Sequence, residues 1–315
     1  MLASYPLISP TTEAYIAPHS LHFSSTRPNE VFAGSNGTVA LFDISRPGEG
    51  PVEVMRTGRR RRRRAARSLG TPAIVLAAEA EDGLRGIVSA MDTSCDGVLA
   101  AGTFSRNVGL YGEYGHGATD AIFSLHGGGD DDDDDNDGTK GNGITQVIWD
   151  RSGRYLCVAE RGSDGVGIWD IRGGTGKRLA WLRGRKANTQ QRMGVEVLYG
   201  EVWAGGTDGV VRVWEGLGMK EGAIDCDWQF AAHGDVVNGI GLHPGGTVLA
   251  TCSGQRHYPE DEQKGFNDDD EDDECDSKFS DGFHASLSRK PSSIRAEPET
   301  AGAHCFDNSL NVWAL

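Results

Sequence analysis

Short runs of alternating apolar and polar residues recur along this chain, and each run ends close to an aromatic residue. The three clearest copies read Val-Gly-Ile-Trp-Asp at 166–170, Val-Val-Arg-Val-Trp-Glu at 210–215 and Leu-Asn-Val-Trp-Ala at 310–314. Softer copies occur at 38–43 and 107–112. A period of two residues predicts β-strands, and a repeated strand with this ending is typical of the blades of a WD-type β-propeller.

The spacing of the aromatic anchors shows where the repeat is interrupted. The anchors lie 69, 58, 45 and 99 positions apart, at Phe42, Tyr111, Trp169, Trp214 and Trp313. Only the third spacing matches the roughly 40–45 residues of a WD-type blade. The longer gaps contain low-complexity segments at about 56–72, 127–141 and 257–304. We predict that these charged insertions are disordered and that the repeat is regular without them.

Each repeat has the same internal order of strands and turns. An alternating strand such as 144–149 is followed by a turn, a strand of small and branched residues, a second turn and the aromatic strand. The second turns carry Asp-Gly or Asn-Gly, which suit tight hairpins. The sequence therefore predicts an all-β, WD40-type β-propeller that forms a single domain over 1–315, with five four-stranded blades. Another antiparallel architecture, such as a β-sandwich, is the alternative.

Charge is distributed very unevenly. The formal net charge is -15, but the acidic stretches at 130–137 and 260–276 together carry about -17, so the rest of the chain is close to neutral. The predicted propeller body can therefore face RNA despite the acidic total. The arginine run at 59–64 suits either phosphate contact and nuclear import or a solvated loop. The acidic runs suit a solvated loop or a docking tail for basic proteins.

Patterns of catalysis, metal binding and membrane insertion are absent from the sequence. It contains no nucleophile elbow, no phosphate-cradling glycine loop and no His-Glu-x-x-His. The six cysteines include no Cys-x-x-Cys pair and suit a reduced, intracellular chain. No apolar run is long enough to span a membrane. We therefore expect a protein that is not an enzyme, with no cofactor, metal, membrane partner or small-molecule substrate.

Several longer segments are more specific than the aromatic endings. They read Ala-Gly-Thr-Phe-Ser-Arg-Asn-Val-Gly-Leu-Tyr at 101–111, Asn-Thr-Gln-Gln-Arg at 188–192 and Leu-Ala-Thr-Cys-Ser-Gly-Gln-Arg at 249–256. In order and spacing they resemble the telomerase Cajal body WD-repeat protein family. The resemblance extends from near the start of the chain to Leu315, apart from the insertions. It implies a nuclear, seven-bladed propeller that binds small Cajal body RNAs and telomerase RNA through a loop signal.

The same resemblance sets an expectation for the beginning of the chain. Five blades are predicted here, whereas the family pattern leads us to expect two more before Met1. Residues 1–5 resemble the outer strand of a later blade. We therefore expect an N-terminally truncated propeller with an open, apolar flank.

Five polar residues stand at positions that match the family pattern and have the chemistry of RNA contacts. Arginine suits phosphate or base-edge contact, and glutamine adds amide donors and acceptors. The candidates are Arg106, Gln191, Arg192, Gln255 and Arg256. The alternative is that these side chains order the blade turns by binding backbone carbonyls.

Two functions are consistent with these patterns. The first is a nuclear WD-repeat protein that binds small nuclear, Cajal body or telomerase RNA and aids ribonucleoprotein assembly or trafficking together with protein partners. The second is a protein-only WD-repeat scaffold, for example a splicing or ubiquitin-ligase subunit. The glutamine–arginine segments favour the first function.

Overall fold

The computed structural model describes residues 3–57, 84–116, 119–125, 141–173, 178–254 and 307–315, together with the backbone of 75–76 and 292–293. These residues form five sheets, and each contains four antiparallel strands. The prediction of an all-β chain built from WD-type blades is confirmed. The predicted insertions fall almost entirely outside the described residues, so their disorder stays a prediction.

The five sheets follow one another along the chain. The first contains β1 (Ser20–Phe23), β2 (Glu30–Ser35), β3 (Thr38–Asp43) and β4 (Glu53–Arg56). The second contains β6 (Val88–Thr93), β7 (Leu99–Thr103), β8 (Asn107–Tyr111) and β9 (Thr119–Ser124), with β5 (Val75–Leu76) at its edge. The third contains β10 (Ile144–Trp149), β11 (Tyr155–Glu160), β12 (Gly165–Asp170) and β13 (Arg178–Arg183). The fourth contains β14 (Val195–Leu198), β15 (Glu201–Gly205), β16 (Val210–Glu215) and β18 (Trp228–Ala231). The fifth contains β19 (Val237–Leu242), β20 (Val248–Ser253), β22 (Leu310–Ala314) and β21 (Ser292–Ser293).

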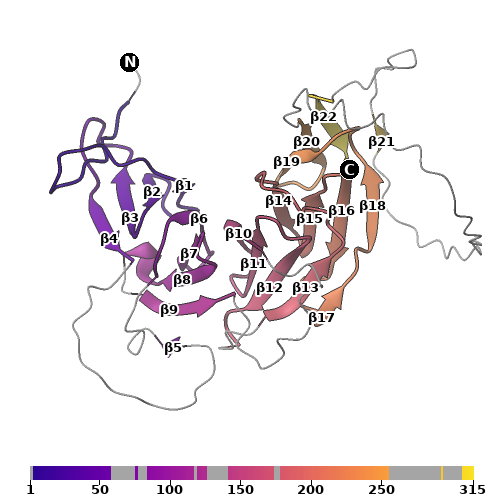
Figure 1. Ribbon diagram of the computed structural model, residues 1–315, viewed down its shortest axis with the longest axis horizontal. Coiled ribbons are helices and arrows are strands. Elements are labelled where there is room, and N and C mark those ends of the chain that lie inside the picture. Colours follow the sequence, from indigo (N-terminus) through magenta and orange to yellow (C-terminus); the bar gives the residue numbers. More distant parts are fainter. Residues whose placement is uncertain are drawn as a thin grey trace, which may run out of the picture.

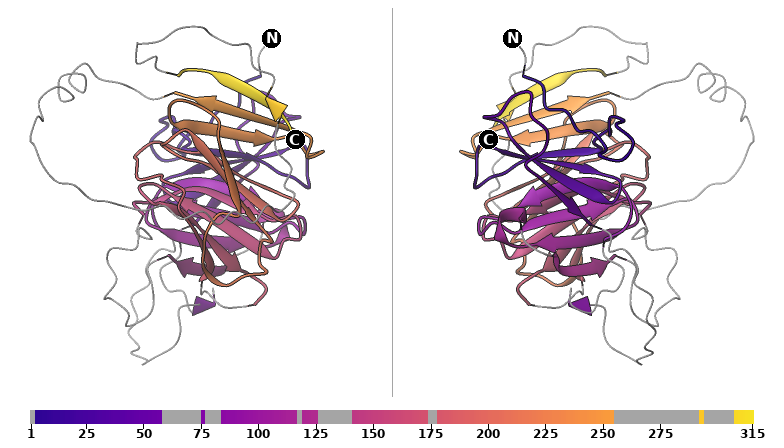
Figure 2. Two further views of the ribbon diagram at one scale, coloured as in Figure 1. Left: turned by 90° about the vertical axis from the view of Figure 1, so that its right-hand side faces the viewer. Right: turned by 90° about the vertical axis from the view of Figure 1, so that its left-hand side faces the viewer.

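The sheets stand side by side along an arc, with the first and last sheets at its two ends (Figure 1). The first strand of each sheet, namely β1, β6, β10, β14 and β19, lies on the inner side of the arc, and later strands lie progressively outward. Seen edge-on, the strands run from one face of the arc to the other (Figure 2). Three short strands depart from the simple repeat. The strands β5 and β21 lie at outer sheet edges out of chain order, and β17 (Gly222–Ile224) pairs in parallel with β13 of the neighbouring sheet.

The aromatic anchors fill the interfaces between neighbouring sheets. Trp169 on β12 packs against Val108 and Phe123 of the preceding sheet, with 5.9 Å between the ring centroids of Phe123 and Trp169. Tyr111 and Trp214 are buried in the same way against the sheets before them. Burying an aromatic side chain of this size stabilises a fold by about 2–3 kcal/mol. The anchors therefore recur in the sequence because each blade needs one to bind its predecessor.

The N-terminal segment takes the corresponding position on the first sheet. Phe42 packs against Tyr5 and Leu7, and the Tyr5 hydroxyl donates a hydrogen bond to the carbonyl of Ile44 at 2.6 Å. Residues 3–7 form no strand. The expectation of an outer strand at residues 1–5 is therefore wrong for its described part, because these residues cover an apolar sheet face instead of pairing with a sheet edge.

Small residues near the end of the second strand let the next sheet approach closely. A Cβ atom on Gly102 of β7 would lie 2.7 Å from Cγ2 of Ile144, the first residue of β10. Gly34 of β2 stands in the same relation to Val88 of β6, also at 2.7 Å. The inner strands thus pack at distances that only glycine permits at these points.

The strand order divides the connections between two faces of the arc. We call face A the side that carries the connections from the second to the third strand of each sheet and from each sheet to the next. Face B carries the other connections within the sheets. Because the strands of a sheet are antiparallel, these two classes of connection emerge on opposite sides.

Candidate nucleic-acid interface

The three predicted contact residues that the structure describes belong to connections on face A. Arg106 lies between β7 and β8, and Gln191 and Arg192 lie between β13 and β14. Gln255 and Arg256 follow β20 in the chain but lie outside the described residues. The topology therefore brings residues from separate repeats to the same face, which is what a single binding surface requires.

Arg106 is held by a carboxylate of the next sheet. Its Nε and Nη2 donate to the two carboxylate oxygens of Glu160 on β11, at 2.6 and 3.0 Å. The side chains of Arg106 and Glu160 are only 15% and 6% exposed. Such a two-pronged pair fixes the guanidinium, so Arg106 joins the second and third sheets. Its contact with RNA stays a prediction.

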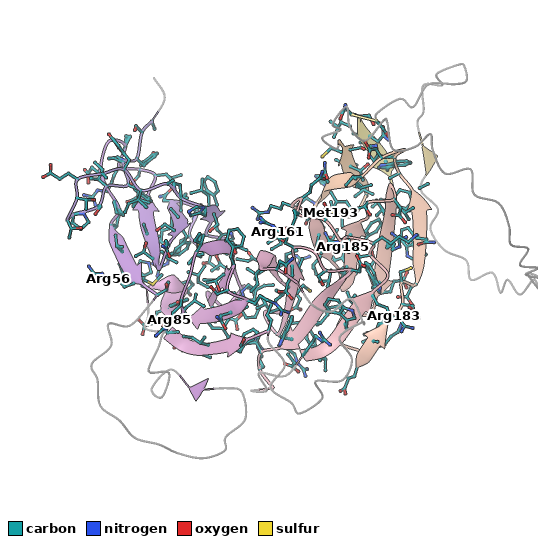
Figure 3. All side chains as sticks on the ribbon, viewed as in Figure 1. Arg56, Arg85, Arg161, Arg183, Arg185 and Met193 are labelled. Atoms are coloured by element: carbon teal, nitrogen blue, oxygen red, sulfur yellow. The ribbon has the colours of Figure 1, made fainter. Side chains whose placement is uncertain are left out.

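The loop that carries Gln191 and Arg192 is anchored by a buried arginine. Arg185 donates from Nη2 to the carbonyl of Met193 at 2.8 Å and from Nε to the carbonyl of Gly205 at 3.3 Å, which ties both ends of the loop to β15 (Figure 3). Burial lowers the pKa of Arg185 from 12.5 to about 10. Arg212 donates to the carbonyl of Arg185 and forms a two-pronged pair with Asp208. The loop is thus a fixed platform on face A.

The two predicted residues of this loop have different environments. Arg192 is exposed and forms no ion pair with the residues that the structure describes. Gln191 is half-buried, and its Oε1 is a buried acceptor without a hydrogen-bond partner in the same part of the chain. An exposed cation at Arg192 therefore adjoins a buried amide oxygen at Gln191 that has no hydrogen-bond partner among the described residues.

The structure adds a neighbouring cluster that the sequence patterns did not indicate. The guanidinium carbon of Arg161, directly after β11, lies 5.0 Å from the centroid of the Phe104 ring. The backbone of the adjacent Gly162 donates to the carbonyl of Thr189 at 3.0 Å, which joins this turn to the loop of Gln191 and Arg192. Figure 3 shows Arg161 extending toward the inner side of the arc. The sequence did not single out Arg161, because this arginine lies outside the segments that carry the family pattern.

Face B differs from face A in the pairing of its charged residues. A cavity on this face is bounded by Arg27, Glu30, Phe42, Val52 and His116 among others. Arg27 there forms an ion pair with Glu30 at 3.0 Å, and the His116 ring lies 2.9 Å from a carboxylate oxygen of Glu53. In the described part of the chain, no cluster of three metal-ligating side chains occurs, and no helix is long and apolar enough to cross a membrane.

The sequence matches no protein-family model. It is 29% identical to telomerase Cajal body protein 1 of Mus musculus over 254 residues, which are 79% of this chain and 40% of the mouse protein. It is 30% identical to telomerase Cajal body protein 1 of Homo sapiens over 253 residues, 79% of this chain and 39% of the human protein. The chain belongs to the telomerase Cajal body protein family. This confirms the resemblance carried by the segments at 101–111, 188–192 and 249–256.

A fungal protein with a different name is also similar. Guanine nucleotide-binding protein negative regulator 1 of Schizosaccharomyces pombe is 30% identical over 162 residues, 51% of this chain and 36% of that protein. The chain spans about 40% of the length of the mammalian relatives it matches. None of these relatives is named as an enzyme. The chain is a WD-repeat protein of the telomerase Cajal body protein family.

Proposed function

We propose that this chain is a nuclear, non-catalytic WD-repeat protein that binds small nuclear, Cajal body or telomerase RNA through face A. In this proposal it aids the assembly or trafficking of ribonucleoproteins with protein partners. The names of the mammalian relatives support a nuclear role connected with telomerase and Cajal bodies. The cluster of Arg161, Arg192 and Gln191 on face A is the observation that carries RNA binding.

The chemistry of this cluster fits a polyanion with exposed bases. Arg192 is exposed, and Arg161 makes a ring contact but no ion pair with the described residues. Neither cation is neutralised within this part of the protein, so a phosphate can bind without displacing a carboxylate. Each phosphate neutralised releases counterions, which makes the affinity fall as salt rises. Gln255 and Arg256 stay predicted contacts, because their chain segment begins at the same face.

RNA affinity at several salt concentrations tests this function. Replacing Arg192→Ala should weaken binding and reduce the slope of log affinity against log salt by about 0.7–0.9. Arg154→Ala is the matched control, because Arg154 lies on face B and binds Asp170 at 2.6 Å. An unchanged slope with intact folding would remove Arg192 from the site. Failure of the wild-type chain to bind any small nuclear RNA would overturn the proposal.

The protein-only scaffold remains the second candidate, and one observation favours it. In the last sheet, Leu310 and Val312 of β22 are 69% and 57% exposed. In the first sheet, Leu21 and Phe23 of β1 are also exposed. Exposed apolar side chains on sheet faces suit protein contacts. The salt titration separates the two functions, because a protein-only scaffold would show no RNA affinity at low salt.

A further inference from the structure

The first residue after the second strand of each sheet can be compared across the five repeats. It is Asn36, Phe104, Arg161, Gly206 and Gly254 in turn along the chain. Three of these five turns form with glycine or asparagine, so the turn itself needs no large side chain. The aromatic ring and the guanidinium in the second and third sheets therefore require another explanation.

The backbone holds these two side chains together. The amide of Arg161 donates to the carbonyl of Gly143 at 2.9 Å, and the amide of Asn142 donates to the carbonyl of Arg161 at 2.7 Å. Gly143 has a φ of +128°, and a Cβ there would lie 3.0 Å from Cα of Phe104. Glycine at this point thus lets the connection of Arg161 pack directly on the turn of Phe104.

One donor in this arrangement is unused. Nε of Arg161 is buried and makes no hydrogen bond to the described residues, although a buried donor of a charged group is normally satisfied. The guanidinium is held over the Phe104 ring and not by a carboxylate. A guanidinium that lies over an aromatic ring and is not paired with a carboxylate can present its other face to an unstacked base.

Two amide side chains lie beside the residue that follows Arg161. Gly162, directly after Arg161, has a φ of +66°, and a Cβ at this point would lie 3.3 Å from Nδ2 of Asn142 and 3.8 Å from Nε2 of Gln190. Asn142 and Gln190 are both exposed. Amides of this kind donate to and accept from the edge of a base.

We propose that Phe104 and Arg161 form a stacking site for one unpaired base of a single-stranded RNA, with Asn142 and Gln190 at the base edge. This inference rests on the proposed function and deepens it, because it assigns two residues of face A to contact with an unpaired base. Bases within an A-form duplex are stacked on one another and present no face to a side chain. A base splayed out of a loop or a single strand presents such a face to the guanidinium plane.

Fluorescence anisotropy with two probes at the same salt tests the site. One probe is an unstructured 12-nucleotide RNA of mixed sequence, and the other is a fully paired RNA duplex of equal length. We expect the wild-type chain to prefer the single strand, and Arg161→Lys and Phe104→Leu each to weaken that binding about tenfold. Lysine keeps the charge of Arg161 but loses the plane. Arg154→Lys is the matched control and should change affinity less than twofold, because Arg154 lies on face B and binds Asp170 at 2.6 Å.

The outcomes separate the two proposals. If the wild-type chain binds the single strand and both Arg161→Lys and Phe104→Leu bind it within twofold of wild type, the stacking site is overturned and RNA binding stands. Equal affinity of the wild-type chain for the duplex likewise overturns the site. If the wild-type chain binds neither probe, the proposed function fails and the site with it. Melting temperatures verify folding, and if Phe104→Leu does not fold, Arg161→Lys decides alone.

Discussion

Glu196 on the inner strand β14 links the packing of the arc to pH. Burial raises its pKa from 4.5 to about 7, and the nearby charge of Asp92 on β6 adds to the rise. The folded chain therefore holds this proton more tightly than the unfolded chain. The contribution of Glu196 to the free energy of unfolding is therefore most favourable below pH 4.5. It falls as the pH rises from 4.5 to about 7 and stays constant at the lower value above pH 7.

The structure sets the size of this cost. The interval from 4.5 to about 7 corresponds to roughly 3 kcal/mol at most. Because Glu196 is only partly buried, solvent screening reduces the expected value to about 1–2 kcal/mol. Glu196→Gln removes the charge at nearly constant shape. The variant should therefore exceed the wild type in free energy of unfolding by about 1–2 kcal/mol at pH 8.

Urea unfolding followed by tryptophan fluorescence measures this difference. The advantage of Glu196→Gln should shrink as the pH falls toward 5. Asp92, with a pKa raised by burial to about 6, also loses stability as the pH rises, whereas His22, with a pKa lowered by burial to about 4, gains it. Both groups are present in both proteins, so the difference reports Glu196 together with its coupling to Asp92. An advantage that does not depend on pH, or one shared by the exposed control Glu221→Gln, would refute the reasoning.

Three further outcomes follow from contacts described above. A double-mutant cycle with Arg106→Met and Glu160→Gln should give a coupling of about 2 kcal/mol in urea unfolding, and a coupling near zero would show that the pair does not join the sheets. Gly102→Ala should lower the free energy of unfolding by about 1–3 kcal/mol, because its Cβ meets Ile144; Gly241→Ala, whose Cβ would meet no atom within 4 Å, is the control and should be nearly neutral. In thiol labelling followed by mass spectrometry, exposed Cys95 should react in the native chain, whereas Cys157, whose pKa is raised by complete burial, should react only after unfolding.

Local sequence patterns were sufficient to predict the blades. Trp169 and Trp214 are buried at sheet interfaces because a blade needs an apolar anchor at that position, and this need leaves a visible repeat. The strand β17 leaves no such trace. Three residues, Gly222–Ile224, are too short to show a period, and they form a strand only because β13 offers a free edge.

The candidate site was less predictable than the fold. Arg106 and Glu160 are 54 positions apart, so no local pattern shows that this arginine is already paired. Arg161 and Phe104 meet across two sheets. Phe104 lies in the family segment at 101–111, but Arg161 lies in none of these segments. Arg192 was found because it ends a segment with a recognisable family pattern. Side-chain chemistry that depends on contacts between repeats becomes visible only in the folded arc.

The crossing of β17 into the third sheet has a mechanical consequence. In the connection from β16 to β18, Gly222 pairs with Ala180 and Ile224 pairs with Leu182 of β13. Arg183 also forms a bidentate ion pair with Asp225 of this connection. In a row of repeats, each unit normally separates from the next by breaking only face-to-face contacts. Here backbone hydrogen bonds bridge two units. A force applied to the chain ends should therefore release the third and fourth sheets together, as one step of extension about twice that of a single blade.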